Sequence, residues 1–420
     1  MINPKPQIHS TAKPQVPHYT RLEAPNGTPL YVLHNSNQGV VRVSFVFRAG
    51  TSYQSVPFSA SAVVNTLTEG TEQLSGREIA ERLDFVGSYY DANIDRDWAV
   101  VTFCSLSKFS PETMDIAEQV VLHPTFPERE ISVYCHKRKE QLDVQRSKPD
   151  QLSRELFGQA IFGQTHPYGI TSPSEEYDHL TPAILREFYE SHYTAEGCFA
   201  VLCGDISSAD TKRVLAILGG LRRGGTALVR EIPAPDPVEY AKWHFEGAVQ
   251  SSVKVGVPLF PRSNPDFIPM QVVATAMGGY FGSRLMQNLR ERNGLTYGAY
   301  AAMINLDRSG YFVMSAEVAG EATDRAIAEV MAEVERITTK PLHPKELSVV
   351  KKIIFGDVMR IFDGPFGVAD VSIENIQNGT DNSYTENFLA QVESLTPKML
   401  RDVAARNIDK NELTVTIVGD

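Results

Sequence analysis

The sequence predicts an α+β fold in which two similar α/β sandwich domains face each other like the halves of a clam shell. Three observations predict it: a repeat between the two halves of the chain, helices that follow strands in each half, and a glycine- and proline-rich segment between the halves. The length of 420 residues agrees with two domains. A single hydrophobic core seldom serves more than roughly 250–300 residues.

The repeat relates the closing segments of the two halves. Leu180-Thr181-Pro182 begins an expected amphipathic helix, and an apolar strand at 198–203 then leads to Gly204-Asp205. The same order runs from Leu395-Thr396-Pro397 to Gly419-Asp420, at an offset of 215 residues (395 − 180 and 419 − 204). A segment repeated at a fixed offset indicates that one structural unit is built twice.

Each half is expected to begin with strands, because apolar and polar residues alternate there with the period of a half-buried strand. The expected strands are 19–33, 41–47, 240–244 and 251–257. The expected hairpins are 88–105, with a turn near Asp95-Arg96-Asp97, and 295–318, with a turn near Asp307-Arg308-Ser309. Helices and a last strand complete each half, which is typical of helices packed on one face of a sheet.

We expect four segments along the chain. They are a flexible N-terminal tail at 1–17, a first α+β domain at 18–218, a linker at 219–238 and a second α+β domain at 239–420. The glycines of 219–225 leave the linker free to turn. Pro233, Pro235 and Pro237 then stiffen it into an extended strut.

The composition bears on location and partners. A net charge of −11 without a basic run leads us to expect no nucleic-acid partner. Residues 1–17 lack the apolar core of a signal peptide or a membrane span, so we expect a cytoplasmic protein without membrane contact. The four cysteines form no C-x-x-C pair and are expected to be reduced and mostly buried.

A local metal motif is absent from the sequence. The closest of the ten histidines are nine residues apart, His9 and His18 (18 − 9), so no two share a helix face at the spacing of a helical zinc motif. Neither H-E-x-x-H nor H-x-x-E-H occurs. Sequence alone leaves open a metalloenzyme whose ligands come from distant positions.

The segment 277–298 has the most distinctive pattern. Its glycines permit close backbone approach, and Ser283 is expected to cap a helix over 284–292. Asn293-Gly294 suits a left-handed helix stop, and a strand is expected over 295–302.

Within this segment Arg290 would end the helix and Tyr297 would begin the strand. Two residues separated by such a reversal can present their tips to one point. The arginine offers a planar donor fork to a carbonyl, and the tyrosine offers a hydroxyl to a developing oxyanion. The pattern equally allows a surface arginine in an ion pair and a tyrosine buried in the sheet.

Gly278 to Tyr297 resembles a stretch of the pitrilysin/insulinase family of zinc peptidases, the inverzincins, which includes the mitochondrial processing peptidase. In that family a glycine-rich loop precedes S-x-L and then L-R-E-x-x-G-L-x-Y, as this segment does. The resemblance spans nearly the whole chain and implies repeated α+β domains joined by a linker. It also implies that Arg290 and Tyr297, with Gly278 and Gly279 of the loop, bind substrate.

The first half departs from the family pattern. Counting back from Gly70-Thr71, a family landmark, the H-x-x-E-H positions fall on 61–65, where Ser61 and Asn65 replace the histidines and Val64 replaces the glutamate. The third metal ligand falls at Gln141. The resemblance therefore implies that this chain holds no metal and has no intrinsic peptidase activity.

Such chains occur in the family as partners of a homologous subunit that carries H-x-x-E-H. The resemblance then implies a heterodimer in which the partner holds zinc, while Arg290 and Tyr297 bind the peptide substrate in trans and stabilise the oxyanion. The peptide would add as a strand to a sheet edge. The alternative is a non-proteolytic scaffold or peptide-binding protein of the same fold.

Overall fold

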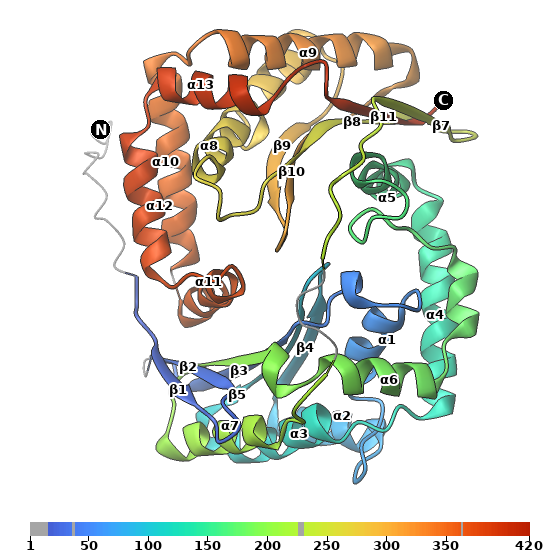
Figure 1. The fold of residues 1–420 in the computed structure, drawn as a ribbon, viewed down its shortest axis with the longest axis vertical. Helices are drawn as coiled ribbons and strands as arrows, with labels where there is room; N and C mark the ends of the chain where they lie inside the picture. Colours follow the sequence, from blue (N-terminus) through green and yellow to red (C-terminus); the bar gives the residue numbers. More distant parts are fainter. Residues whose placement is uncertain (1–15, 36–37, 226–230, 363) are drawn as a thin grey trace, which may run out of the picture.

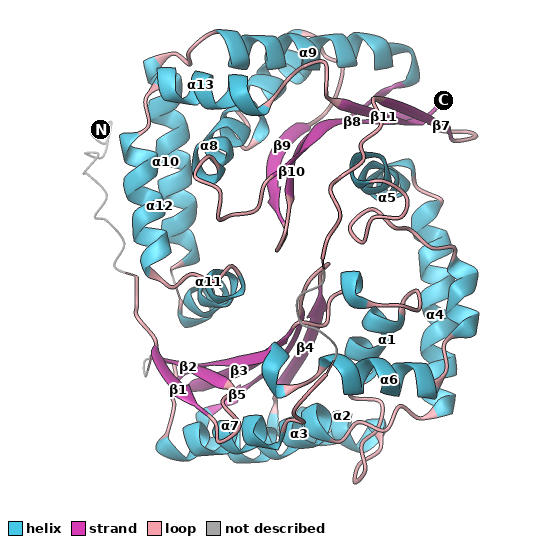
Figure 2. Ribbon diagram, viewed as in Figure 1, coloured by secondary structure: helices cyan, strands magenta, loops and turns pink. Residues whose placement is uncertain are grey.

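The computed structural model describes residues 16–35, 38–225, 231–362 and 364–420. Most of the expected tail at 1–17 and residues 226–230 of the expected linker lie outside the described residues. The chain forms two lobes, each built on one β-sheet, with most helices on the outer side (Figures 1 and 2). The predicted α+β class and its two sheets are thereby confirmed.

The first sheet has six strands in the order β1-β2-β6-β3-β5-β4, and the second has five in the order β7-β11-β8-β10-β9. The strands of the first sheet are β1 (Thr20–Glu23), β2 (Pro29–His34), β3 (Val40–Phe47), β4 (Tyr89–Ile94), β5 (Ala99–Leu106) and β6 (Cys198–Gly204). Those of the second are β7 (Tyr240–His244), β8 (Gln250–Leu259), β9 (Ala299–Asn305), β10 (Gly310–Ala319) and β11 (Thr414–Gly419). One expected strand, 19–33, is instead the hairpin of β1 and β2, because Gly27 adopts a positive φ and turns the chain.

The strand order shows the repeat. Apart from β1, the two orders match strand for strand, with β6 in the place of β11. In each sheet one pairing is parallel, β2 with β6 in the first and β7 with β11 in the second. The other pairings are antiparallel. The two halves therefore share one topology.

The helices of the first half are α1 (Ser59–Thr66), α2 (Gly76–Val86), α3 (Ser110–Leu122), α4 (Glu128–Arg146), α5 (Pro149–Phe162), α6 (Pro182–His192) and α7 (Ser208–Gly220). Those of the second half are α8 (Phe267–Gly278), α9 (Thr323–Thr339), α10 (Pro344–Ile361), α11 (Pro365–Gln377), α12 (Ser383–Ser394) and α13 (Pro397–Asn407). None of the helices in the described ranges is long and apolar enough to cross a bilayer.

Two of these helices are exchanged between the lobes. Helix α5 of the first half packs against β8 and β11, and α11 of the second half packs against β6 (Figure 1). The two helices occupy equivalent places in the repeat, since their starts are 216 residues apart (365 − 149) and their ends 215 (377 − 162). Each lobe therefore needs a helix from the other half of the chain. The domain boundaries expected at 218 and 239 stay a prediction.

Apolar side chains hold the exchanged helices. Val368, Ala369 and Ile373 of α11 form one buried cluster with side chains of the first sheet, among them Phe199. Phe157, Ile161 and Phe162 of α5 form another with Val313 of β10. Burying such side chains stabilises each contact by roughly 1.5–3 kcal/mol per residue.

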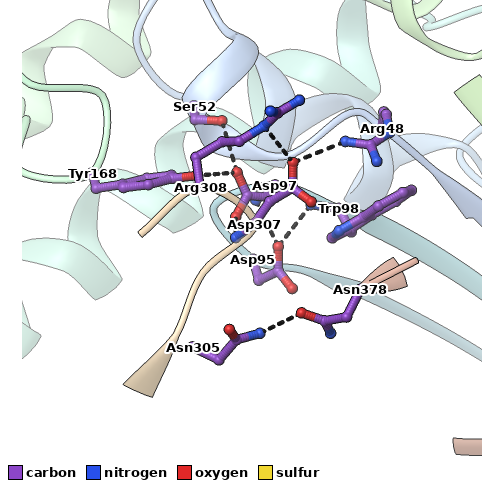
Figure 3. A network of polar contacts seen from close by, with 10 residues as sticks. All are labelled: Arg48, Ser52, Asp95, Asp97, Trp98, Tyr168, Asn305, Asp307, Arg308 and Asn378. Carbon is purple, nitrogen blue, oxygen red and sulfur yellow. Dashed lines mark hydrogen bonds and ion pairs between the residues drawn. The ribbon is translucent and has the colours of Figure 1, made fainter. Parts of the chain in front are cut away.

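The two hairpin turns meet where the lobes join (Figure 3). The buried carboxylate of Asp97 accepts the backbone N–H of Asp307 at 2.9 Å and the hydroxyl of Tyr168 at 2.8 Å. Arg48 donates to Asp307 at 3.0 Å while its guanidinium lies 4.3 Å from the centre of the Trp98 ring. The predicted turns near Asp95 and Asp307 are thus the tips of two hairpins that fasten one lobe to the other.

We predict that Asp97→Ala destabilises the protein by about 3 kcal/mol, because the buried Tyr168 hydroxyl and the Asp307 N–H lose their acceptor. The measurement is the thermal unfolding temperature by calorimetry. Asn93→Ala on the same hairpin is the control, since Asn93 is exposed and its side chain donates to Asp91 of the same strand. Equal unfolding temperatures for the two variants would contradict the role of Asp97.

We also predict that stability decreases as the pH falls from about 6.5 to about 4, in part because of His192. This ring is buried against Phe188 and Tyr53, and burial lowers its pKa from 6.5 to about 4. A depressed folded-state pKa of a base means that the unfolded chain takes up the proton first, so stability is lost on acidification. His192→Phe should flatten this part of the curve of unfolding free energy against pH.

Candidate functional site

The helix that carries Arg290 begins at Arg284, as predicted, and continues as a π-helical segment, Met286–Arg292. The predicted cap at Ser283 is wrong. Its side chain is fully buried, and within the described residues its hydroxyl has no hydrogen-bond partner. The helix end is as predicted, because Gly294 adopts φ +60° and turns the chain out of the helix.

Buried polar contacts fix the π-helical segment. The side-chain amide of Asn288 donates to Glu333 of α9 at 2.7 Å, and both side chains are buried. Asn293 donates to the side chain of Asn288 at 2.7 Å, and Leu289 is fully buried. Since these contacts hold the inner face of the segment, Arg290 points away from the core and is partly exposed.

Tyr297 lies in an anchored turn before β9. The hydroxyl of Thr296 donates to the carbonyl oxygen of Glu317 at 2.6 Å and accepts the N–H of Gly298 at 3.2 Å. These bonds keep the chain out of the sheet, so β9 begins at Ala299 and the prediction of a strand from Leu295 is wrong. The tyrosine side chain is 88% exposed. The alternative of a tyrosine buried in the sheet is therefore excluded.

Arg290 and Tyr297 do not touch each other in the structure: across the described residues neither side chain bonds to the other. Arg290 instead lies over the ring of Phe281, 4.8 Å from its centre, and its Nε is 3.6 Å from the carboxylate of Glu291. Phe281 is 61% exposed. Sequence reasoning missed this aromatic, although a phenylalanine in a glycine-rich loop has few apolar neighbours and is a signal for an exposed ring.

The two glycines predicted to bind substrate have a clear packing role. A Cβ on Gly278 would lie 2.0 Å from the backbone nitrogen of Ala301, so only glycine lets the end of α8 rest on β9. A Cβ on Gly279 would lie 2.7 Å from the Cα of Thr275. Their contact with substrate stays a prediction.

The four positions that replace the family's metal-site residues lie on α1 and α4. The side chain of Asn65 donates to the carbonyl oxygen of Ser61 at 2.7 Å, and the hydroxyl of Tyr134 donates to the same oxygen at 3.2 Å. Val64 is fully buried in the core. On α4, Gln141 accepts from Arg138 at 3.2 Å.

Arg138 lies on α4, four residues after Tyr134, whose hydroxyl makes the contact with α1. Its guanidinium bonds to the hydroxyls of Tyr134 and Tyr177; burial lowers its pKa and these hydroxyls raise it by more, so it stays protonated. A fixed positive charge and the neutral side chains of Ser61, Asn65 and Gln141 do not fit a zinc ion, which takes imidazole, thiolate or carboxylate ligands. Within the described residues no group of three His, Cys, Asp or Glu could hold a metal. Sequence reasoning missed Tyr134 and Arg138.

A cleft of about 500 Å³ lies between the first sheet and α11. Its acidic side chains are Asp91, Asp95, Asp370 and Glu374, and its one basic side chain is Arg42, which forms an ion pair with Asp370. The edge strand β4 contributes to its wall. The cleft therefore has a net negative charge beside an unpaired sheet edge.

The chain is thus a protein of two similar α+β lobes, in which the described residues bring together no three His, Cys, Asp or Glu side chains that could hold a metal. The chain matches the model "Insulinase (Peptidase family M16)" over residues 34–173 and the model "Peptidase M16 inactive domain" over residues 179–354. It belongs to the insulinase family, peptidase family M16. The predicted family resemblance is confirmed.

Several proteins are similar to this chain in sequence, and several solved structures are similar to it in fold. The uncharacterized zinc protease YmxG of Bacillus subtilis is 21% identical over 81% of this chain and 83% of its own. An uncharacterized zinc protease of Mycobacterium tuberculosis is 23% identical over 82% of this chain and 80% of its own. The peptidase M16 inactive domain of Pseudomonas fluorescens superposes with a TM-score of 0.88 at 22% identity, covering 96% of this chain and 98% of that one. A protease from Helicobacter pylori superposes with a TM-score of 0.86 at 16% identity, covering 96% of this chain and 99% of that one.

We predict that restoring the ligands alone gives weak zinc binding. In the triple variant Ser61→His, Asn65→His, Gln141→Glu, the Arg138 cation would oppose the metal ion and pair with the new carboxylate. Adding Arg138→Met should tighten binding by about tenfold or more, because it removes this cation and because groups around the ligands change metal affinity by roughly 10- to 100-fold. Calorimetric titration with zinc measures this, with Arg138→Met alone as the control. Equal affinities of the triple and quadruple variants would refute the role of Arg138.

Proposed function

We propose that this chain is the substrate-holding, catalytically inactive subunit of a two-chain zinc peptidase. A homologous partner bearing H-x-x-E-H would supply the zinc, and this chain would supply Arg290 and Tyr297 in trans. The observation that carries the proposal is Tyr297, a tyrosine kept 88% exposed by a turn that Thr296 anchors. An exposed tyrosine on an anchored turn gives up apolar burial, which suits a hydroxyl donor that awaits a ligand.

Other side chains at the surface of this segment fit the same role. Arg290 lies at the surface, over Phe281 and in an ion pair with Glu291, and its guanidinium fork would turn from this pair toward a substrate carbonyl. Tyr300, in β9, is also partly exposed. β9 is an edge strand of the second sheet and begins two residues after Tyr297, so a peptide added to this edge would bring its carbonyl groups beside the tyrosine.

The inactive status of the chain rests on α1 and α4. Ser61, Asn65 and Gln141 offer no ligand that zinc prefers, and Val64 offers no group to take a proton from water. The acidic cleft beside β4 favours peptides with basic side chains. The uncharacterized zinc proteases among the relatives support the peptidase context, although their names say nothing of this chain's partner.

A scaffold or peptide-binding protein without proteolysis is the second candidate. The replaced metal-ligand positions favour it as much as they favour an inactive subunit. The two candidates differ in what Arg290 and Tyr297 do. In a scaffold, the loss of either polar tip would change nothing that a peptide-cleavage assay measures.

We predict that the purified chain cleaves no peptide alone and that a mixture with an H-x-x-E-H homologue from the same cell does. Arg290→Ala or Tyr297→Phe should lower kcat of the mixture by about 10²- to 10³-fold, the usual effect of removing one oxyanion donor. Complex formation, measured by size-exclusion chromatography with light scattering, should be unchanged.

Tyr240→Phe is the matched control, because Tyr240 is an exposed tyrosine on the other edge strand, β7. Cleavage by the chain alone would rule out the inactive-subunit proposal. Full activity of both variants in an assembled complex would support the scaffold instead.

A further inference from the structure

A groove of about 980 Å³ lies between α2 and α3 on the outer side of the first lobe. Its floor is apolar, because Leu74, Val86 and Ile116 are nearly buried there. Phe85 stands at its border and is 90% exposed, the most exposed large apolar side chain in the described part of the chain. None of these residues takes part in the site that carries Arg290 and Tyr297.

Phe85 is not part of the stripe that packs α2 onto the lobe. Ile79, Leu83 and Val86 form that stripe, at helical spacings of four and three residues, and all three are buried. Phe85 lies one position before the stripe ends and points to solvent. A bare phenylalanine gains nothing for the folded monomer, whereas aromatic side chains are typical anchors of protein interfaces.

The rim of the groove is acidic. Five carboxylates line it, from Glu78, Glu81, Glu112, Asp115 and Glu118, against two guanidinium groups, from Arg82 and Arg213. A third guanidinium group, from Arg77, pairs with Glu81 at 2.7 Å, which leaves −2 (3 − 5). Arg213 is engaged by Asp115 at 2.6 Å and by Glu118. Glu112 is exposed and has no ion-pair partner among the described residues.

We propose that this groove binds a basic, amphipathic peptide segment of another protein, whose apolar side chains pack on Phe85 and the groove floor while its lysines or arginines meet the acidic rim. Net charge disfavours the other occupants. A second copy of this chain has a net charge of −11, and an anionic lipid surface is also negative, so the rim repels both. An apolar face with a basic rim is the complementary surface.

The inference goes beyond the proposed function, because the groove and the Arg290/Tyr297 site lie in different halves of the chain. A binding assay on the groove and a cleavage assay on the site can therefore succeed or fail separately.

The probe is a fluorescein-labelled peptide of about 14 residues with leucines at helical i, i+3, i+4 and i+7 spacing and lysines elsewhere. Fluorescence anisotropy with the full chain should show binding that weakens as salt rises. A twin peptide with glutamates in place of the lysines should not bind. Phe85→Ala should weaken binding by about tenfold or more, the effect of losing an interface anchor.

Glu112→Lys should also weaken binding and reduce its salt dependence. Glu386→Lys makes the same charge change at an exposed site on α12 and should leave the affinity as in the wild type. Circular dichroism checks that the variants fold, which is expected because Phe85 and Glu112 are exposed. The proposal would be overturned if both groove variants bound the peptide with wild-type affinity, or if Glu386→Lys weakened binding equally. It would also be overturned if the lysine peptide did not bind.

Discussion

The exchange of α5 and α11 is the constraint on which the rest of the structure depends. Each sheet has one face covered by helices of its own half and another that a helix of the opposite half covers. The hairpin tips add a polar contact at the same junction, where Asp97 accepts from Asp307 and Tyr168. Apolar and polar contacts cross between the halves in both directions. Each sheet therefore needs the other half of the chain to cover one of its faces.

This junction connects the fold to the site. The hairpin of β9 and β10 reaches the other lobe with its tip at Asp307 and begins just after Tyr297. The π-helical segment that presents Arg290 is anchored to α9 through Asn288 and Glu333. Both exposed side chains therefore sit on elements that are fixed at their inner ends. Fixed placement of hydrogen-bond donors is what stabilisation of a developing charge requires.

Local sequence patterns predicted the structural features that depend on residues close together in the chain. The turns at Asp95 and Asp307 and the stop at Gly294 could be found because each rests on residues close in sequence. The repeat could be found because the same short patterns occur twice in the chain. The alternation of 295–302 suggested a strand, but the hydroxyl of Thr296 bonds to Glu317, 21 residues away, and delays it. The exchange of α5 could not be predicted, since periodicity shows that a helix has an apolar face and not which sheet covers it. The contact in which the hydroxyl of Tyr134 on α4 donates to the carbonyl oxygen of Ser61 on α1 likewise depends on how the two helices meet.

The exchange has a consequence for the order in which the chain can fold during synthesis. Helix α5 rests on β8 and β11, and β11 begins 252 residues after α5 ends (414 − 162). The side chains of Phe157, Ile161 and Phe162 pack with Val313 of β10 and lack this cover until the ribosome has made the second half as far as β10. Contacts this distant in sequence form slowly, and an apolar helix exposed for that time is a natural target for chaperones.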